Sequence, residues 1–199
     1  MIIGLEELLR AAAALETLLR RSGWQFCFIG GVAVQRWGTP RFTQDIDLAL
    51  LTGFGNEETF VDALLKELNP RRQDAREFAL RSRVLLAQTR EGVDVDIALA
   101  ALAFEERCVA RASAWQLGDG TMLTTCSAED LIVHKAFAGR GLDWGDVERV
   151  LIRQHGKLNV AQIHSELRPL LELKGEIEAL DQLNRLFATV ERRLSSKVP

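Results

Sequence analysis

The stretch "FIGGVAVQRWGTPRFTQDIDLAL", residues 28–50, decides the fold. Two glycines, Gly30 and Gly31, follow a short apolar run that is typical of a strand. Two aspartates one residue apart, Asp45 and Asp47, then begin a second apolar run. Burying a carboxylate without a partner is costly, so these two side chains must face either water or cations.

Carboxylates in this pattern predict a cation site. Successive strand side chains point to opposite faces, so Asp45 and Asp47 share one face with Cα atoms roughly 6.5–7 Å apart. The later run "VDVDIALA" (93–100) repeats the pattern with Asp94 and Asp96. Asp96 lies deeper in its apolar run and is the better third carboxylate, although the sequence leaves the choice open. A hard cation such as Mg²⁺ binds such oxygens together with substrate phosphates.

The glycines predict the other half of the site. At the end of a strand and the start of a helix, Gly30 and Gly31 would let a phosphate approach free backbone N–H groups. A tight turn without any ligand is the structural alternative for the glycines, and an edge or loop position is the alternative for the aspartates. The conjunction of both motifs with a second aspartate pair favours a site for a metal ion and a phosphate.

Hydrophobic periodicity predicts an α+β chain with a small mixed sheet flanked by helices. The expected front elements are a helix over 5–21, a strand over 26–29, a short helix over 32–37, a strand over 45–51, a helix over 56–68, and strands over 77–88 and 93–100 joined by "TREG". From Ser127, a good helix start, only helical patterns follow. We therefore expect a domain over 1–126 and a helical C-terminal region over 127–199 that packs on it.

Charge and composition limit the partners. The 199 residues are 47% hydrophobic and 27% charged, with a net charge of −3, which gives no global field to gather nucleic acid or coat an anionic membrane. A local basic patch is conceivable around six arginines, and a solvated face is its alternative: Arg71, Arg72, Arg76, Arg81, Arg83 and Arg90. Arg81 and Arg83 would share a strand face.

The remaining residue types indicate no further site. Cys27, Cys108 and Cys126 form no CxxC pair, which argues against a zinc site or a disulfide framework and predicts small core residues. The chain start carries no secretory signal pattern and no run of 18 apolar residues occurs, so we expect a cytoplasmic protein without a membrane span. The histidines show no ligand spacing, and the tryptophans predict packing, although Trp37 is near enough in sequence to stack on a base.

The motifs together resemble those of a known protein family. "IGG", thirteen residues, "DIDLAL" and a later "VDIAL" are similar to the nucleotidyltransferase fold of the DNA polymerase β superfamily. "RFTQDIDL" (41–48) is similar to the branch with the AbiEii-type toxin and the antibiotic nucleotidyltransferases. In "DLIVHKAFAGRGLDWGDV" (130–147), a lysine, an arginine five residues on, and two spaced aspartates resemble the AbiEii-type run. They are Lys135, Arg140, Asp143 and Asp146.

The resemblance implies roles for these positions. Asp45 and Asp47 would bind Mg²⁺, and Asp96 would hold metal or act as the general base on the acceptor hydroxyl. The implied nucleotide-binding residues are Gly30, Gly31, Arg41, Thr43, Lys135 and Asp146. Lys135 would act in catalysis as a phosphate contact, with an exposed surface lysine as the alternative. Arg140, Asp143 and Asp146 could equally cap helices and pair between them.

The resulting hypothesis is a Mg²⁺-dependent nucleotidyltransferase that moves an NMP group from an NTP to a hydroxyl. We expect a toxin-like enzyme acting on tRNA, other RNA or protein, with an antitoxin partner or a homodimer as the open assembly states. The alternatives are a transferase for a small molecule of the antibiotic type, and a non-catalytic, antitoxin-like binding module with the same fold. A metal-dependent phosphodiesterase is a third class, which the glycine turn disfavours.

Overall fold

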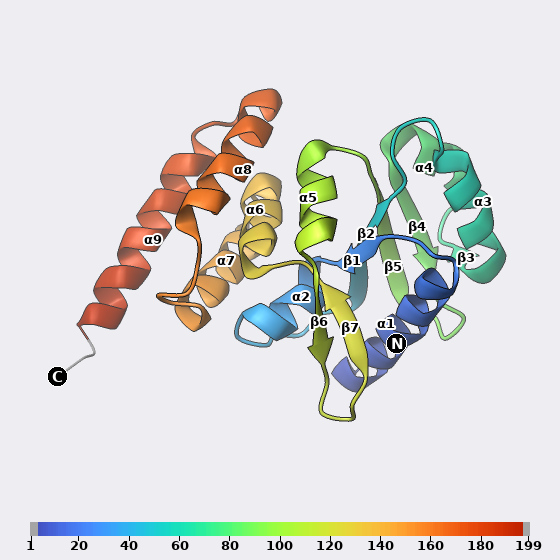
Figure 1. The fold of residues 1–199 in the computed structure, drawn as a ribbon, viewed down its shortest axis with the longest axis horizontal. Helices are drawn as coiled ribbons and strands as arrows, with labels where there is room; N and C mark the ends of the chain where they lie inside the picture. The colour runs from blue at the N-terminus through green and yellow to red at the C-terminus, as the bar shows by residue number, and fades with distance from the viewer. Residues whose placement is uncertain (1–3, 197–199) are drawn as a thin grey trace. The chain divides into compact units, whose positions relative to one another are not determined.

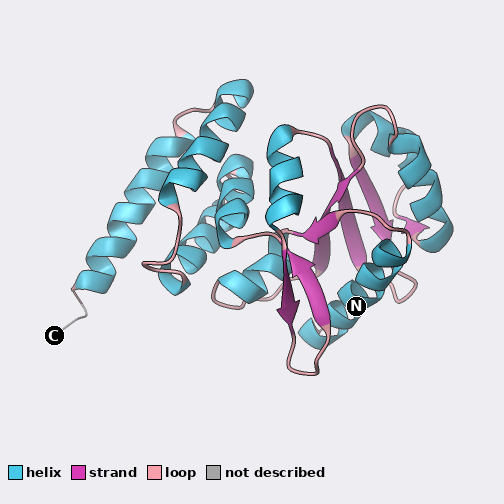
Figure 2. Cartoon of the chain, in the orientation of Figure 1, coloured by secondary structure: helices cyan, strands magenta, loops and turns pink. Residues whose placement is uncertain are grey.

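The computed structural model describes residues 4–196 (Figure 1). Its elements are α1 (Leu5–Arg21), β1 (Phe26–Phe28), α2 (Gly30–Trp37), β2 (Asp45–Leu51), α3 (Glu57–Glu67), β3 (Asn69–Pro70), α4 (Ala75–Ser82), β4 (Val84–Gln88), β5 (Asp94–Ala100), α5 (Ala103–Arg111), β6 (Ser113–Gln116), β7 (Met122–Thr125), α6 (Ala128–Ala138), α7 (Gly141–Arg153), α8 (Val160–Lys174) and α9 (Ala179–Ser195). Strands precede the four long C-terminal helices along the chain (Figure 2). The α+β class and the helical C-terminal part predicted from the sequence are confirmed.

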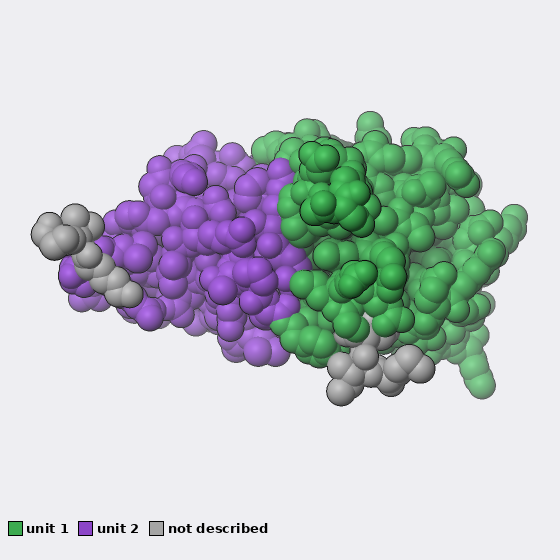
Figure 3. All heavy atoms as spheres, turned by 90° about the horizontal axis from the view of Figure 1, so that it is seen from below, with its two compact units in different colours: residues 1–32, 42–126 green, residues 33–41, 127–199 purple. Residues whose placement is uncertain are grey.

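The chain divides into two compact units, which Figure 3 colours separately. Unit 1 is the chain up to Val32 together with Phe42–Cys126, and unit 2 is Ala33–Arg41 together with the chain from Ser127 onwards. Helix α2 begins in unit 1 and continues in unit 2. The packing of a 127–199 region on a 1–126 domain stays a prediction.

Unit 1 is built on one mixed sheet. Within the described residues its seven strands have the order β3-β4-β5-β2-β1-β7-β6. The central pair, β2 and β5, is parallel, and β1 and β4 run antiparallel to it on either side. A hairpin at 89–93 joins β4 to β5, as "TREG" predicts. The parallel pair at the centre is what brings the two aspartate motifs together.

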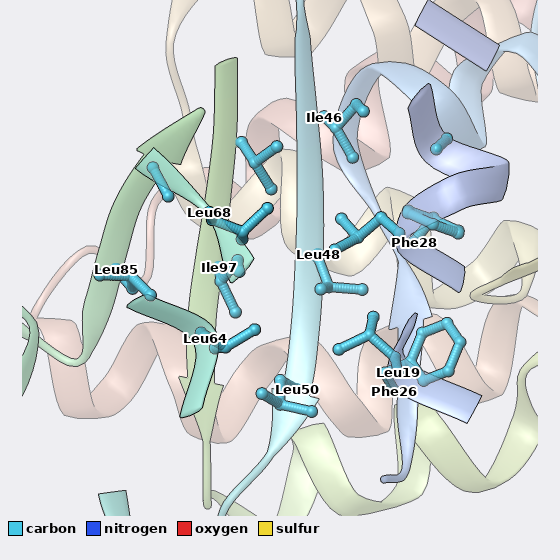
Figure 4. Packing of buried hydrophobic residues seen from close by; sticks show 14 of the residues in the cluster. Leu19, Phe26, Phe28, Ile46, Leu48, Leu50, Leu64, Leu68, Leu85 and Ile97 are labelled. Atoms are coloured by element: carbon cyan, nitrogen blue, oxygen red, sulfur yellow. The ribbon is translucent and has the colours of Figure 1, made fainter. Parts of the chain in front are cut away.

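The apolar face of the sheet forms the core of unit 1. Alternate residues of β2 and β5, including Ile46, Leu48 and Ile97, are fully buried, and α1 and α3 add Leu19 and Leu64 to the same cluster (Figure 4). Fully burying a side chain of this size contributes about 1.5–3 kcal/mol. Because side chains alternate, this burial fixes which residues of β2 and β5 point to the opposite face.

Helix α5 packs against β1 and β2. The Sγ atoms of Cys27 and Cys108, from β1 and α5, lie 3.9 Å apart, and Cys126 is buried as well. The prediction of small core cysteines is confirmed. Cys27 pairs with Ala49 and therefore shares the face of Asp47. Helix α5 thus packs on this face close to Ala49, two residues after Asp47.

One predicted strand is wrong in its first half. Residues 77–82 belong to α4, which ends at Arg83 in the left-handed conformation with φ 57°. The alternation of Phe78 and Leu80 in "EFALRSRVLLAQ" fits a strand, but α4 buries Ala75 and Ala79, which are four residues apart as on one helix face. Only 84–88 pair in the sheet. Arg81 therefore lies on a helix and Arg83 caps it, so the predicted shared strand face does not exist.

The part of unit 2 after residue 127 contains the helices that the sequence predicts. The Ser127 side chain accepts a hydrogen bond from Asp130 N at 3.0 Å and begins α6, as its residue type predicts, and Gly139 with φ 68° ends it. Leu131 and Val147 of α6 and α7, together with Ile163 and Leu183 of α8 and α9, are fully buried. Among the helices of residues 4–196, none has the length and apolar character that crossing a bilayer requires.

Candidate active site

The glycine turn holds one of the predicted carboxylates. Gly30 has a left-handed φ of 53°, and a Cβ at this position would lie 1.8 Å from Oδ2 of Asp47. The backbone N–H of Gly31 points at the same oxygen, with an N–O distance of 3.3 Å. Both the conformation and the contact require glycine at position 30. The turn therefore sets Asp47 against the start of α2, where N–H groups favour negative charge.

Thr43 connects this turn to the other aspartate of β2. A Cβ on Gly31 would lie 2.2 Å from Oγ1 of Thr43, so the second glycine is needed for a close approach as well. The same hydroxyl donates a hydrogen bond of 3.0 Å to Oδ1 of Asp45. Gly30, Gly31, Thr43 and both aspartates of β2 thus form one connected corner of unit 1.

The second aspartate motif lies beside the first. In the parallel pairing of β2 and β5, Asp45 is opposite Asp94 and Asp47 is opposite Asp96. Directly paired residues point to the same face of a sheet. All four carboxylates therefore share the face opposite the apolar core. Asp96 is the partner of the aspartate that contacts the glycine turn, which favours it over Asp94 as the third carboxylate.

The electrostatics of Asp96 reflect this crowding. Burial raises the pKa of its carboxyl group, the charges of Asp45 and Asp94 raise the pKa further, and Arg71 opposes the shift. Arg71 Nη2 lies 2.8 Å from Oδ1 of Asp96. This buried oxygen nevertheless has no hydrogen bond of good geometry among the described residues. Asp96 thus combines an elevated proton affinity with an unsatisfied acceptor.

The donor set fits a hard divalent cation. It consists of carboxylate oxygens on one face, with an unsatisfied oxygen on Asp96, and such oxygens are the ligands that Mg²⁺ prefers. These side chains do not converge on one point. Among residues 4–196, no three His, Cys, Asp or Glu side chains are grouped closely enough to hold a metal ion. Asp45 is engaged by Thr43, Asp47 by Gly31, and Asp96 by Arg71.

The arginines between positions 71 and 90 do not form a free basic track. Arg72 pairs with Asp74, Arg76 with Asp62 and Glu58, and Arg90 with Glu67. Arg71 contacts Asp94 and Asp96. Arg83 pairs with Glu57 and donates to the carbonyls of Gly53 and Leu99. Five of the six guanidinium groups therefore already face a carboxylate of the same unit.

A second group of predicted residues meets in unit 2. Arg41 makes two hydrogen bonds, of 2.6 and 2.7 Å, to the two oxygens of Asp146. Lys135 Nζ lies 2.9 Å from Asp143 and 3.0 Å from Asp146. Asp146 is fully buried and Lys135 is 8% exposed. The alternative of an exposed surface lysine does not hold, and the pairing alternative for the two aspartates describes this arrangement.

The charges in this cluster support each other. Burial alone would raise the pKa values of Asp143 and Asp146, but hydrogen bonds from Arg140 and Lys135 to the first, and from Arg41 and Lys135 to the second, outweigh it. Both pKa values are therefore lowered, and both side chains remain ionised at neutral pH. The cluster thus holds the side chain of Arg41, a residue two positions before Thr43 in the sequence.

Sequence reasoning assigned no role at the carboxylates to Arg71. Arg71 follows β3 and contacts β5 from across β4, so its partners are 23 and 25 residues away in sequence. No local spacing reports such a contact. The signal that was available is the position of Arg71 directly after Pro70, which ends the helical pattern of 56–68 and predicts an extended segment there.

Comparison with known proteins identifies the fold. No family model and no curated protein sequence matches the chain. Among solved structures, an antigenic nucleotidyltransferase-like protein from Paracoccidioides brasiliensis aligns with a TM-score of 0.53 at 17% identity, over 90% of this chain and 94% of that one. This likeness shows that the chain has the nucleotidyltransferase fold, as the sequence resemblance implies.

Two antibiotic-modifying enzymes are also similar. The lincosamide antibiotic adenylyltransferase LnuA aligns with a TM-score of 0.49 at 12% identity, over 75% of this chain and 98% of that one. ANT(2")-Ia, in a complex with adenylyl-2"-tobramycin, aligns with a TM-score of 0.43 at 16% identity, over 94% and 97%. Identities this low leave the reaction and the acceptor to be argued from the residues of this chain.

Proposed function

We propose that this chain is a divalent-cation-dependent nucleotidyltransferase that moves an NMP group from an NTP to a hydroxyl group of a small molecule. The observation that carries the proposal is the corner of unit 1 in which Asp47 lies beside Asp96 and against the Gly30–Gly31 turn. A carboxylate pair next to a helix start supplies both a cation site and an anion site.

Each residue would have a distinct role. Asp45, Asp47 and Asp96 would hold Mg²⁺, which supplies positive charge against the phosphates when bound. Gly30 and Gly31 would present N–H groups to the triphosphate. The acceptor oxygen forms a bond to the α-phosphorus, the bond from that phosphorus to pyrophosphate breaks, and the hydroxyl proton passes to a base. Asp96, with its raised pKa, is the carboxylate best suited to accept that proton.

Three residues of unit 2, Arg41, Lys135 and Asp146, would have a structural role and would not contact the nucleotide. The carboxylate oxygens of Asp146 are occupied by Arg41 and Lys135, and the Lys135 ammonium group is shared between two aspartates. The nucleotide contacts implied for Arg41, Lys135 and Asp146 would require these buried pairs to open, which is costly. We therefore assign the three residues to holding the segment before Thr43.

The paired arginines support a small molecule as the acceptor. Each phosphate that a protein neutralises normally demands a Lys or Arg, and five of the six candidates in 71–90 are engaged by carboxylates. A long RNA footprint on this segment would have to break those pairs. The toxin-like reading, with RNA or protein as acceptor and an antitoxin partner, is therefore the second candidate.

The test is transfer of label from α-³²P-labelled NTPs in the presence of Mg²⁺. Three acceptor pools should be compared: total tRNA, a protein extract, and a panel of hydroxyl-rich small molecules that includes an aminoglycoside and a lincosamide. We expect label in the small-molecule pool only. Label in tRNA or protein would establish the toxin-like alternative, and no label with any NTP and any pool would favour a non-catalytic binding module.

A further inference from the structure

Arg71 spans a whole strand to reach the carboxylate face. Its backbone N–H donates to the carbonyl of Leu86 on β4, and Leu86 is paired with Asp96 on β5. Strands are about 4.8 Å apart, so the arginine backbone starts about 10 Å from β5. The extended side chain ends with Nη1 2.9 Å from Asp94 Oδ2 and Nη2 2.8 Å from Asp96 Oδ1.

The two partners of Arg71 differ in what else holds them. Asp94 also accepts a hydrogen bond of 2.7 Å from Gln88, so its oxygens are satisfied by two groups. Within the described residues, Asp96 is in contact only with Arg71, and its Oδ1 accepts no hydrogen bond of good geometry. Asp94 is therefore the firm anchor of the guanidinium, and Asp96 is the partner that can turn away.

We propose that Arg71 is an internal counter-cation that holds Asp96 until a divalent cation binds, and that Asp94 retains the guanidinium when Asp96 turns to the cation. This inference rests on the proposed function, because it assigns Asp96 to that cation. It gives a role to Asp94, which the metal set of Asp45, Asp47 and Asp96 leaves unused. Arg71 and the divalent cation then compete for one carboxylate.

Competition predicts effects of opposite sign for the two partners. When the guanidinium is removed, Asp96 no longer has to give up an ion pair in order to bind the divalent cation. The cation should therefore bind more tightly. Removing the negative charge of Asp94 leaves the guanidinium to Asp96 alone, so the divalent cation should bind more weakly. A residue that merely braced the fold would weaken or leave unchanged the binding in both variants.

The experiment measures Mn²⁺ binding by the loss of the free-ion signal in electron paramagnetic resonance, with and without ATP. We expect Arg71→Ala and Arg71→Gln to lower the Kd several-fold, up to about tenfold, and Asp94→Asn to raise it by a similar factor. The matched control is Arg72→Ala, which removes the neighbouring guanidinium and its pair with Asp74 without touching β5. Its Kd should equal that of the wild type.

The double variant Arg71→Gln/Asp94→Asn shows whether Asp94 affects cation binding through Arg71 or as a ligand of the cation. If Asp94 acts through Arg71, Asp94→Asn should change the Kd by less than about twofold once the guanidinium is gone. If Asp94 is itself a ligand, its full effect persists and the inference is overturned. Circular dichroism of every variant identifies any that fail to fold, and Arg71→Gln preserves much of the side-chain packing.

The outcomes distinguish this inference from the proposed function. Mn²⁺ binding by the wild type with an unchanged or higher Kd in both Arg71 variants overturns the inference and leaves the proposed function standing. No binding by the wild type or by any variant, with or without ATP, overturns both. Binding that appears only in the Arg71 variants supports the inference in its strongest form.

Discussion

Asp47 lies directly opposite Asp96 in the parallel register of β2 and β5. The pair stands two residues further along both strands than Asp45 and Asp94, and it is the pair that meets the glycine turn through the contact of Gly31 N with Asp47. Like charges directly opposite one another destabilise a sheet. The fold therefore carries a local cost that a bound cation would relieve.

Replacing both aspartates of β2 should abolish metal-dependent nucleotide binding without unfolding the chain. Asp45→Ala/Asp47→Ala removes two carboxylates from a like-charged face, so we expect the free energy of unfolding to change by no more than about 1 kcal/mol, with a gain favoured. Calorimetry with ATP and Mg²⁺ should show no binding. Urea unfolding measures the stability.

The control removes the same charges from another part of unit 1. Asp62 and Asp74 are exposed, and they pair with Arg76 and Arg72 respectively. Asp62→Ala/Asp74→Ala should leave nucleotide binding intact. Equal binding by the control and by the Asp45→Ala/Asp47→Ala variant would refute the assignment of the site.

Gly30→Ala should weaken nucleotide binding in addition to the conformational cost of alanine at this position. Its φ of 53° makes any side chain unfavourable by about 1–2 kcal/mol. The added Cβ would also lie 1.8 Å from Oδ2 of Asp47, so the carboxylate must move. We expect the affinity for nucleotide and Mg²⁺ to fall at least about tenfold, as measured by calorimetry.

Gly53→Ala is the matched control for that substitution. Gly53 has a similar φ of 69°, and a Cβ there would meet nothing within 4 Å. It should show the same conformational cost in urea unfolding and no loss of nucleotide affinity. Similar affinities for the two variants would mean that the position of Asp47 does not matter for binding.

The fold was largely predictable because its signals are local. The apolar runs of β2 and β5 and the helical spacing after Ser127 each lie within one element, and the structure confirms them. The failure at 77–82 arose because Phe78 and Leu80 alternate as in a strand, whereas the helix buries Ala75 and Ala79 at a spacing of four. The left-handed Arg83, which marks the end of α4, has no sequence signature, because this conformation is typical of glycine.

The site was predictable only where partners are close in sequence or follow from strand pairing. Asp45 and Asp47 share a face by their spacing, and the parallel register adds Asp96. The contact of Arg71 with β5 crosses β4, and the burial of Lys135 between Asp143 and Asp146 depends on how α6 meets α7. Such long-range relationships require the tertiary structure.

Asp146→Asn should destabilise the chain in a pH-dependent manner. The folded-state pKa of Asp146 is lowered, so its contribution is present above the unfolded pKa of about 4 and is lost as the pH falls through the folded pKa. At pH 7 we expect a loss of about 3 kcal/mol, because Arg41 and Lys135 lose a buried charge partner. Urea unfolding at several pH values measures the difference.

That difference should shrink below about pH 4, since asparagine resembles the protonated acid that the wild type then carries. Glu172→Gln, an exposed change on α8, is the control and should show little difference at any pH. A gap between wild type and Asp146→Asn that stays constant from pH 7 to acid would show that the buried charge is not what stabilises unit 2.

Arg83→Gly tests two opposing effects at one residue. Glycine relieves the left-handed conformation of φ 57°, a gain of about 1 kcal/mol. The guanidinium, however, pairs with Glu57 and donates to the carbonyls of Gly53 at 3.0 Å and Leu99 at 2.5 Å. Hydrogen bonds to charged groups contribute about 1.5–3 kcal/mol each, so we expect a net loss of stability in urea unfolding.

The same contacts tie down the loop between β2 and α3. Phe54 in this loop is 66% exposed. The Arg83 guanidinium carbon lies over its ring, 4.7 Å from the ring centroid. Chymotrypsin should therefore cut at Phe54 faster in Arg83→Gly than in the wild type, because cleavage follows the population of the opened loop. Arg81→Ala, an exposed change on α4, should leave the cleavage rate unchanged. A more stable Arg83→Gly protein with unchanged cleavage would mean that conformational strain at Arg83 outweighs its hydrogen bonds.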